Sequence, residues 1–142
     1  MFILDTNVLS ELIKPQGDQV VLTWFARQSR SALYSTTINL AEIIFGIARL
    51  PHGKKKQNLD KNFSLWQKSG FENKFLSFDV DAACYFGLLK IKHKSHGHNV
   101  STEDLQIAAI ARAHNATLIT RNTKDFASCG IALINPWDMM RP

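Results

Sequence analysis

Short apolar runs alternate along this chain with longer segments of helical periodicity, and this alternation restricts the fold more than any other feature. Five apolar runs predict strands, at residues 2–4, 32–36, 75–78, 117–120 and 131–134. The intervening segments predict helices, at residues 20–27, 38–50, 58–69, 81–92 and 103–114, with a candidate short turn at 123–127. Parallel neighbours need a crossover, which a helix supplies. We therefore expect an α/β fold, with a central parallel β-sheet of four or five strands flanked by helices on both faces.

Length and composition predict a single domain over residues 1–142. A chain of this length buries roughly two thirds of the surface that it exposes when unfolded. Its 45% hydrophobic and 20% charged residues argue against disorder. The most apolar stretch, residues 38–50, is too short to span a membrane and contains Glu42 and Arg49. Because the N-terminus also lacks a signal-peptide pattern, we expect a cytoplasmic protein with no membrane span.

The basic residues and the cysteines say less about function. A net charge of +5 permits a polyanionic partner without requiring one. The densest basic run, Lys54-Lys55-Lys56, is better explained as the solvated start of a helix than as a binding patch. The two cysteines, Cys84 and Cys129, show no metal-site spacing and would be reduced in the cytoplasm. We assign no function to the cysteines.

The first apolar run ends in an acid. Residues 2–4 form a continuous apolar run, as in a strand buried on both faces, and Asp5 follows directly. Apolar residues then recur at helical spacing from Val8 onward, so Asp5 stands where a strand passes into a helix. In open parallel sheets, ligands bind beyond the carboxyl ends of the strands. Asp5 is therefore a candidate site residue, although an ordinary helix cap would explain it equally well.

Three further acids stand in apolar or strand-end surroundings. Glu42 lies inside "INLAEIIFGIARL" and has no basic residue three or four positions away, so a buried carboxylate here needs a partner from elsewhere unless it faces solvent. Asp104 opens "DLQIAAIARA", where it also fits a capping pattern with Ser101. Asp125 follows the strand at 117–120 and would otherwise close a turn. Asp79, after "FLSF", is better explained as a helix cap.

If Asp5, Glu42 and Asp104 lie close together, their negative charges must be neutralised. Like charges ~4 Å apart repel by on the order of 4 kcal/mol at an effective dielectric constant near 20. Either the carboxylates take up protons or a divalent cation binds, and oxygen-only ligands favour Mg²⁺ or Mn²⁺ over zinc. Since Mg²⁺ also takes up phosphate oxygens of a substrate, the pattern points to phosphodiester cleavage.

At this point the chain resembles a known family, the PIN-domain ribonucleases, and in particular the VapC and FitB-like toxins of prokaryotic toxin–antitoxin modules. The similarity runs essentially end to end, over "FILDTNVLSEL", "STTINLAEIIFGIARLPHGKKK", "DLQIAAIARAHNATLITRNTKDF" and the closing "INPW". It implies an acidic, metal-holding catalytic cluster at Asp5, Glu42, Asp104 and Asp125. It also implies supporting roles for Thr6, Thr120 and Asn122, which hold the carboxylates or their waters.

The resemblance implies metal-dependent hydrolysis of RNA, cut internally to leave a 5′-phosphate and a 3′-hydroxyl. The cofactor would be Mg²⁺ or Mn²⁺, which activates the attacking water. Three basic residues near the acidic motif are candidates to hold the RNA backbone, namely Arg112, Arg121 and Lys124. The family also implies a homodimer, a cognate antitoxin that covers or occupies the site, and promoter DNA bound only through the antitoxin complex.

Two other functions stay open on sequence grounds, together with one local departure from the family. A haloacid-dehalogenase-like phosphohydrolase also begins with a strand ending in aspartate, but it needs a second aspartate where this chain has Asn7. A catalytically silent PIN-like module would bind RNA or protein without cutting. The departure is the histidine-rich "HGHNVSTED", residues 96–104, which overlaps the predicted loop at 92–99. There, solvated side chains are a better explanation of His93, His96 and His98 than transition-metal ligands.

Overall fold

The chain folds around five parallel strands, and the computed structural model describes residues 1–139. The strands are β1 (Phe2–Leu4), β2 (Leu33–Thr36), β3 (Phe75–Leu76), β4 (Thr117–Ile119) and β5 (Ala132–Ile134). The helices are α1 (Thr6–Ile13), α2 (Gln19–Ala26), α3 (Thr37–Ala48), α4 (Lys54–Lys68), α5 (Val80–Ser95), α6 (Thr102–Ala113) and α7 (Thr123–Phe126). Two single turns of 3₁₀-helix, Arg30–Ala32 and Pro136–Asp138, complete the described elements. This α/β architecture is the one that the alternation of strand and helix patterns predicts.

The sheet has the strand order β3-β2-β1-β4-β5. After β3 the chain returns to the centre of the sheet and adds β4 on the other side of β1. The first three strands build outward from β1 to one edge, and β4 and β5 then build outward from β1 to the other edge. In register, Phe2 pairs with Leu33 on one side and with Thr117 on the other. The carboxyl ends of β1 and β4 therefore flank the point where the topology switches, which is where open α/β sheets bind ligands.

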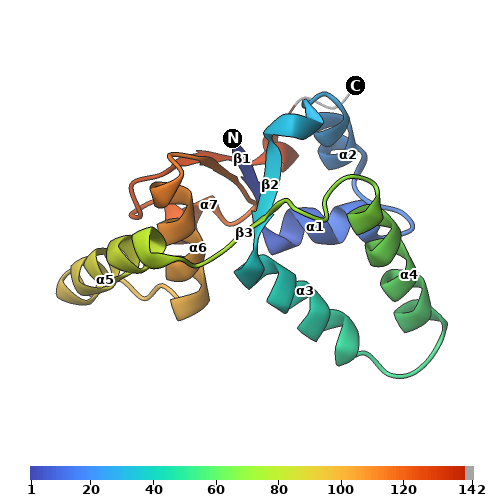
Figure 1. The fold of residues 1–142 in the computed structure, drawn as a ribbon, viewed down its shortest axis with the longest axis horizontal. Helices are drawn as coiled ribbons and strands as arrows, with labels where there is room; N and C mark the ends of the chain where they lie inside the picture. The colour runs from blue at the N-terminus through green and yellow to red at the C-terminus, as the bar shows by residue number, and fades with distance from the viewer. Residues whose placement is uncertain (140–142) are drawn as a thin grey trace.

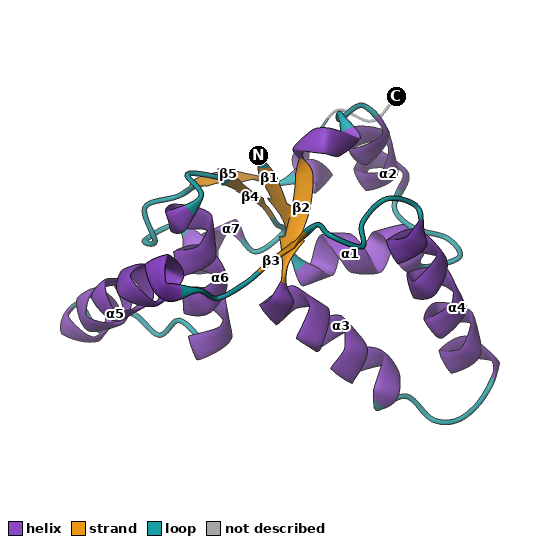
Figure 2. Ribbon diagram, in the orientation of Figure 1, coloured by secondary structure: helices purple, strands orange, loops and turns teal. Residues whose placement is uncertain are grey.

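Helices cover both faces of the sheet (Figures 1 and 2). One core cluster joins Ile3 and Leu118 to α5, α6 and α7, and the other joins Leu4 and Ile119 to α1, α2, α3 and α4. Neighbouring residues of a strand thus enter opposite cores, and all four of these side chains are fully buried. This two-sided burial explains why the strands have continuous apolar sequences.

Two helices extend beyond the ranges predicted from apolar periodicity. Helix α4 begins at Lys54 rather than at residue 58, so the basic run forms its first turn, as expected of a solvated helix start. Helix α5 continues to Ser95, so the loop prediction for residues 92–99 was wrong in its first half. The physical reason is His93, which stands one turn after Leu89 on the buried face of the helix.

His93 is also the exception to the expected solvation of the loop histidines. It is only 2% exposed, and its Nδ1 donates to the Leu89 carbonyl at 2.8 Å, while its Nε2 lies 2.7 Å from Ser128 Oγ. Both ring nitrogens are therefore occupied, which leaves no lone pair for a metal. His96 and His98 are exposed, as expected.

Among residues 1–139, no helix is both long and apolar enough to cross a membrane.

Candidate active site

Asp5 sits at the switch point of the sheet, directly after β1. Its side chain is only 5% exposed and accepts hydrogen bonds on both oxygens. Oδ1 accepts from Thr6 N and from Asn39 Nδ2, each at 2.9 Å, and Oδ2 accepts from Thr120 Oγ1 at 2.7 Å and Asn7 Nδ2 at 3.4 Å. Burial raises the pKa of Asp5 above its ordinary value, and the hydrogen bonds oppose this only in part. Asp5 thus caps α1 and is also a rigidly held, buried acid.

Asn39 is a site residue that the sequence reasoning missed. It is fully buried, and its Oδ1 accepts a hydrogen bond from Thr36 Oγ1 at 2.6 Å, which orients the amide so that Nδ2 faces Asp5. The same Nδ2 donates to Thr6 Oγ1 at 3.0 Å. The available signal was the spacing of Thr36 and Asn39, since a threonine cap three residues before a polar residue marks the first turn of a helix.

Glu42 follows Asn39 by three residues on α3 and is half-buried. Its Oε1 is buried without a hydrogen-bond partner in the described chain. Burial raises the pKa of Glu42 most, and the charges of Asp5 and Asp104 raise it further, while a hydrogen bond with the Thr6 side chain lowers it. An unpartnered carboxylate oxygen in such surroundings is costly, so Glu42 is a candidate to bind a ligand.

Asp104 comes to the same place from the opposite face of the sheet. It lies in the first turn of α6, where its backbone N–H donates to Ser101 Oγ at 3.1 Å, so the capping pattern exists as well. Burial and then the charge of Asp5 raise the pKa of Asp104 from 3.8 to about 6, with a smaller contribution from Asp125. Asp5, Glu42 and Asp104 therefore lie within one another's electrostatic field, although they come from three different elements.

The remaining candidates lie around the end of β4. Asp125 is exposed on α7, and the Asn122 backbone N–H donates to Thr120 Oγ1 at 3.0 Å, which ties the loop to the hydroxyl that holds Asp5. Asn7 Oδ1 accepts from the Arg121 backbone N–H at 3.1 Å. Asn7 thus bridges Asp5 to the β4 loop and provides no second acid, which counts against the dehalogenase-like alternative.

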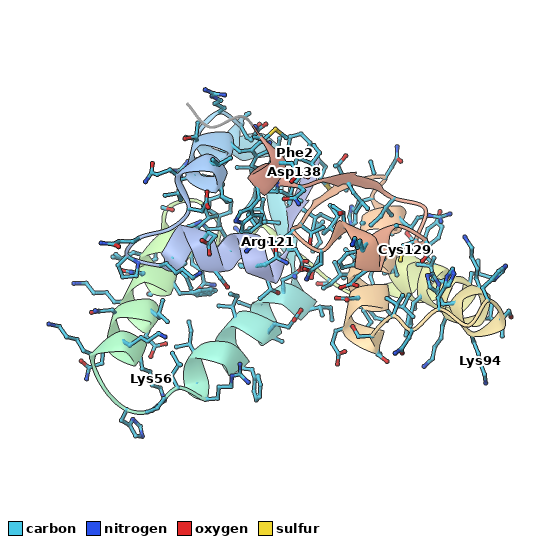
Figure 3. The ribbon with its side chains drawn as sticks, turned by 180° about the vertical axis from the view of Figure 1, so that it is seen from behind. Phe2, Lys56, Lys94, Arg121, Cys129 and Asp138 are labelled. Atoms are coloured by element: carbon cyan, nitrogen blue, oxygen red, sulfur yellow. The ribbon has the colours of Figure 1, made fainter. Side chains whose placement is uncertain are left out.

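The three basic candidates are exposed, but two have their guanidinium groups engaged. Arg121 lies near the middle of the molecule in Figure 3, with its guanidinium 4.9 Å from the ring centre of Trp137. Arg112 donates to the Cys129 carbonyl and stacks over Tyr85 at 5.2 Å. Lys124 is exposed on α7 beside Asp125. Their role toward RNA stays a prediction.

The acidic cluster matches the chemistry of a hard divalent cation. Its donors are carboxylate oxygens, and Glu42 Oε1 is buried and free to accept a ligand. Residues 1–139 contain no group of three His, Cys, Asp or Glu side chains already arranged to hold a metal. Mg²⁺ is commonly bound through one or two carboxylates and several waters, so it does not need a preformed protein cage.

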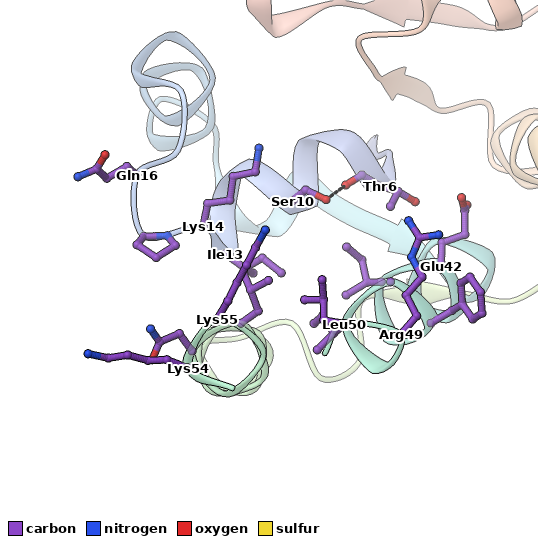
Figure 4. A pocket seen from close by; sticks show the side chains of 17 residues that line it. Thr6, Ser10, Ile13, Lys14, Gln16, Glu42, Arg49, Leu50, Lys54 and Lys55 are labelled. Atoms are coloured by element: carbon purple, nitrogen blue, oxygen red, sulfur yellow. Dashed lines mark hydrogen bonds between the residues drawn. The ribbon is translucent and has the colours of Figure 1, made fainter. Parts of the chain in front are cut away.

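A groove of about 1020 Å³ leads to this cluster between α1, α3 and α4 (Figure 4). Thr6 and Glu42 line it at the cluster, and apolar side chains such as Ile13, Ile43 and Leu50 line it farther away. Its rim carries the cationic residues Lys14, Arg49, Lys54 and Lys55. The groove is therefore apolar inside, basic at its rim and acidic at its inner end.

Comparison with known proteins gives a consistent result. The model of the PIN domain family matches residues 2–130. The plasmid stability protein StbB of Pseudomonas syringae pv. tomato is 39% identical, over 97% of this chain and 99% of its own length, and the VapC ribonuclease Y4jK of Sinorhizobium fredii is 36% identical over the same shares. The crystal structure of FitAcB from Neisseria gonorrhoeae superimposes with a TM-score of 0.89 at 34% identity, covering 98% of this chain and all of that one.

Proposed function

The chain belongs to the PIN domain family, and from this we propose that it is a metal-dependent endoribonuclease and the toxin of a type II toxin–antitoxin module. The observation that carries the proposal is the convergence of Asp5, Glu42 and Asp104 at the switch point of the sheet, where burial raises the pKa of Glu42 and of Asp104 most and the charge of Asp5 raises both further. A cluster of acids that raise one another's pKa has little structural value, because each charge opposes the next. It is suited to taking up a cation and a phosphodiester.

Different residues of this chain would hold the metal ion and position the carboxylates. Asp5, Glu42 and Asp104, with Asp125 at the exposed side, would hold Mg²⁺ or Mn²⁺. A bound ion of this kind lowers the pKa of a water and stabilises charge on the phosphoryl oxygens. Thr120 and Asn39 keep the Asp5 carboxylate fixed, because each donates to one of its two oxygens. This rigidity holds the acid in one position while substrate binds and leaves.

The substrate we propose is RNA, cleaved internally to a 5′-phosphate and a 3′-hydroxyl. Thr6 and Asn122 would order the carboxylates and the surrounding polar groups. Arg121 and Lys124 follow β4 and are exposed, and Arg112 lies in the last turn of α6, eight residues after Asp104. All three would contact the RNA backbone. Such contacts are electrostatic and independent of sequence. The ribonuclease name of the Sinorhizobium relative supports this part of the proposal.

We further propose that a cognate antitoxin occupies the groove between α1, α3 and α4. An amphipathic segment would place apolar side chains against Ile43 and Leu50, acidic side chains against the rim, and one cation toward Glu42. The assembled complex would bind its promoter DNA through the antitoxin, in the cytoplasm, and the toxin itself would form a homodimer.

The decisive experiment is cleavage of a long, mixed-sequence RNA by the purified, antitoxin-free protein. Mg²⁺ or Mn²⁺ should support cutting, and EDTA should abolish it. Asp104→Asn should be inactive, whereas Asp60→Asn, which removes an exposed acid from the middle of α4, should cut normally. Cutting that persists in EDTA would contradict metal dependence. Metal binding without RNA cutting would favour a narrowly selective substrate, and loss of both would favour the silent binding module.

A further inference from the structure

Phe45 on α3 is the only exposed aromatic side chain among residues 1–139. Its exposed fraction is 65%, whereas every other Phe, Trp and Tyr side chain in this part of the chain is buried or half-buried. An aromatic ring has a large apolar area and a π face, so it is costly to leave in water and well suited to contact a flat partner. A single exposed apolar residue is ordinary on a protein surface, but the position of this ring is not.

The ring lies one helical turn from Glu42. Steps of three and four residues place Glu42, Phe45 and Arg49 on one face of α3 and its C-terminal cap, and all three line the groove that leads to the acidic cluster. In Figure 4 the side chains of Glu42 and Arg49 stand beside each other at the same end of the groove. Residues three apart on a helix have Cβ atoms about 5–6 Å apart, which is close to the span of one nucleotide. A polynucleotide with a phosphate at Glu42 therefore brings its adjacent base within reach of Phe45.

One face of the ring is already paired with a cation. The Arg49 guanidinium carbon lies 5.7 Å from the Phe45 ring centre, in the range of a cation–π contact. Within residues 1–139, no other ring stacks on Phe45, so its second face is open to a flat ligand. Lys54 and Lys55 line the same groove and add positive charge to it. A basic groove with an aromatic platform is the usual arrangement for binding single-stranded nucleic acid.

We propose that Phe45 and Arg49 form a stacking subsite for an unpaired RNA base beside the phosphodiester that is cut. This inference rests on the proposed ribonuclease function and names how that site holds its substrate. Stacking needs no particular base, because every base has a π face. A base in a duplex is already stacked on its neighbours, so the subsite selects single-stranded RNA. An RNA base fits better than an apolar side chain of a protein, because the groups beside the ring, Arg49 and the proposed metal ligand Glu42, both serve to bind phosphate.

The first test measures the affinity of the purified, antitoxin-free protein for a labelled single-stranded RNA, by fluorescence anisotropy in EDTA. Phe45→Ala should raise the dissociation constant about 5- to 150-fold, the range for loss of one stacked base. The slope of log affinity against log salt should stay unchanged, because the ring carries no charge, whereas Arg49→Ala should reduce that slope by about 0.7. Annealing a complementary strand should remove the difference between the wild type and Phe45→Ala.

Three further variants separate stacking from simple apolar contact. Phe45→Trp keeps a π face and should bind at least as tightly as the wild type, whereas Phe45→Leu keeps apolar volume without a π face and should bind as weakly as Phe45→Ala. Ile44→Ala is the matched control and should bind like the wild type, since Ile44 is 56% exposed next to Phe45 but lines a different pocket. Wild-type affinity in Phe45→Ala would overturn the proposal. Wild-type affinity in Phe45→Leu would also overturn it, and would indicate an apolar contact of the kind that a protein segment makes.

The second test locates the stacked base with abasic substrates. The cleavage position on an oligonucleotide is mapped with the wild type and Mg²⁺, and the nucleotide on each side of the cut is then made abasic in turn. One of the two abasic substrates should raise the KM of the wild type as much as Phe45→Ala does, with kcat little changed, and Phe45→Ala should lose nothing further on that substrate. Additive losses at both positions would overturn the subsite. A wild type that cuts no RNA would refute the proposed function instead, and the binding test would still decide on the subsite.

Discussion

Replacing Asp104 by asparagine should stabilise the metal-free protein at neutral pH while removing its activity. The rise of the Asp104 pKa from 3.8 to about 6 corresponds to ~3 kcal/mol against the charged form in the folded state. Asp104 is half-buried, so solvent screening reduces this penalty by roughly half. The substitution also removes a carboxylate from the first turn of α6, where a negative charge interacts favourably with the helix dipole. This loss reduces the gain in stability by about 0.5 kcal/mol. We expect a net gain of about 1 kcal/mol in the free energy of unfolding.

The size of this gain in stability depends on pH. Because the folded-state pKa is raised, folded protein retains a proton on Asp104 that unfolded protein has released, and this group makes the wild type less stable as pH rises from 3.8 to about 6. Asp104→Asn lacks that titration. The variant should therefore exceed the wild type in free energy of unfolding by little near pH 4 and by the full amount at pH 7.5. Urea unfolding in EDTA at both pH values measures it, and the thermal midpoint at pH 7.5 should rise by about 3–4 °C.

The control is Asp60→Asn, which removes an exposed acid far from the cluster and should change stability by less than about 0.5 kcal/mol at either pH. Asp104→Asn being less stable than wild type at pH 7.5 in EDTA would refute the reasoning. A gain of equal size at both pH values would also refute it, because the gain would then come from something other than the carboxylate charge.

Four further outcomes follow from the same contacts. Asn39→Ala should lower the free energy of unfolding by about 2–3 kcal/mol, since it leaves Thr36 and Asp5 short of partners, and it should slow RNA cleavage about 10–100-fold in a single-turnover assay. His93→Leu should destabilise by about 1–3 kcal/mol in thermal unfolding, whereas His96→Leu should stay within about 0.5 kcal/mol. Arg121→Ala and Lys124→Ala should each reduce the slope of log affinity against log salt for single-stranded RNA by about 0.7, measured in a cleavage-deficient background. Mg²⁺ at 100 times its dissociation constant should stabilise the wild type by about 2.7 kcal/mol and Asp104→Asn by much less, in the same urea assay.

The fold was largely predictable because its strands have a distinctive sequence. Residues such as Ile3 and Leu4 enter opposite cores, so most of the strands are largely apolar and stand out from the amphipathic helices, although β2 ends in Ser35 and Thr36. Helix ends were harder to locate. The first turn of α4 is made of lysines without an apolar residue, and the last turn of α5 buries His93, which apolar periodicity does not detect. The start of α4 and the end of α5 therefore depend on solvent exposure and on tertiary contacts, and the spacing of apolar residues in the sequence does not reveal them.

The acids of the candidate site were easier to find than the groups that hold them. Asp5, Glu42 and Asp104 stood out because a carboxylate in an apolar segment is a local anomaly. Asn39 did not, because its function depends on Asp5, thirty-four residues away, and on the direction in which Thr36 turns its amide. The spacing of Thr36 and Asn39 marks the first turn of a helix, but the hydrogen bond from Asn39 to Asp5 joins two elements and exists only in the assembled sheet edge.

The neutrality of those partners explains why the cluster retains its charge repulsion. The donors that the structure shows on Asp5 are a backbone N–H, two amides and a hydroxyl, and none carries a charge. Neutral donors fix the position of a carboxylate but offset its charge only in part, so the charge of Asp5 adds to burial, the larger cause, in raising the pKa values of Glu42 and Asp104. A permanently charged donor in the place of Asn39 would offset the charge of Asp5 at every pH. With an amide there, the remaining charge is left to be offset by protons or by the cation that we propose.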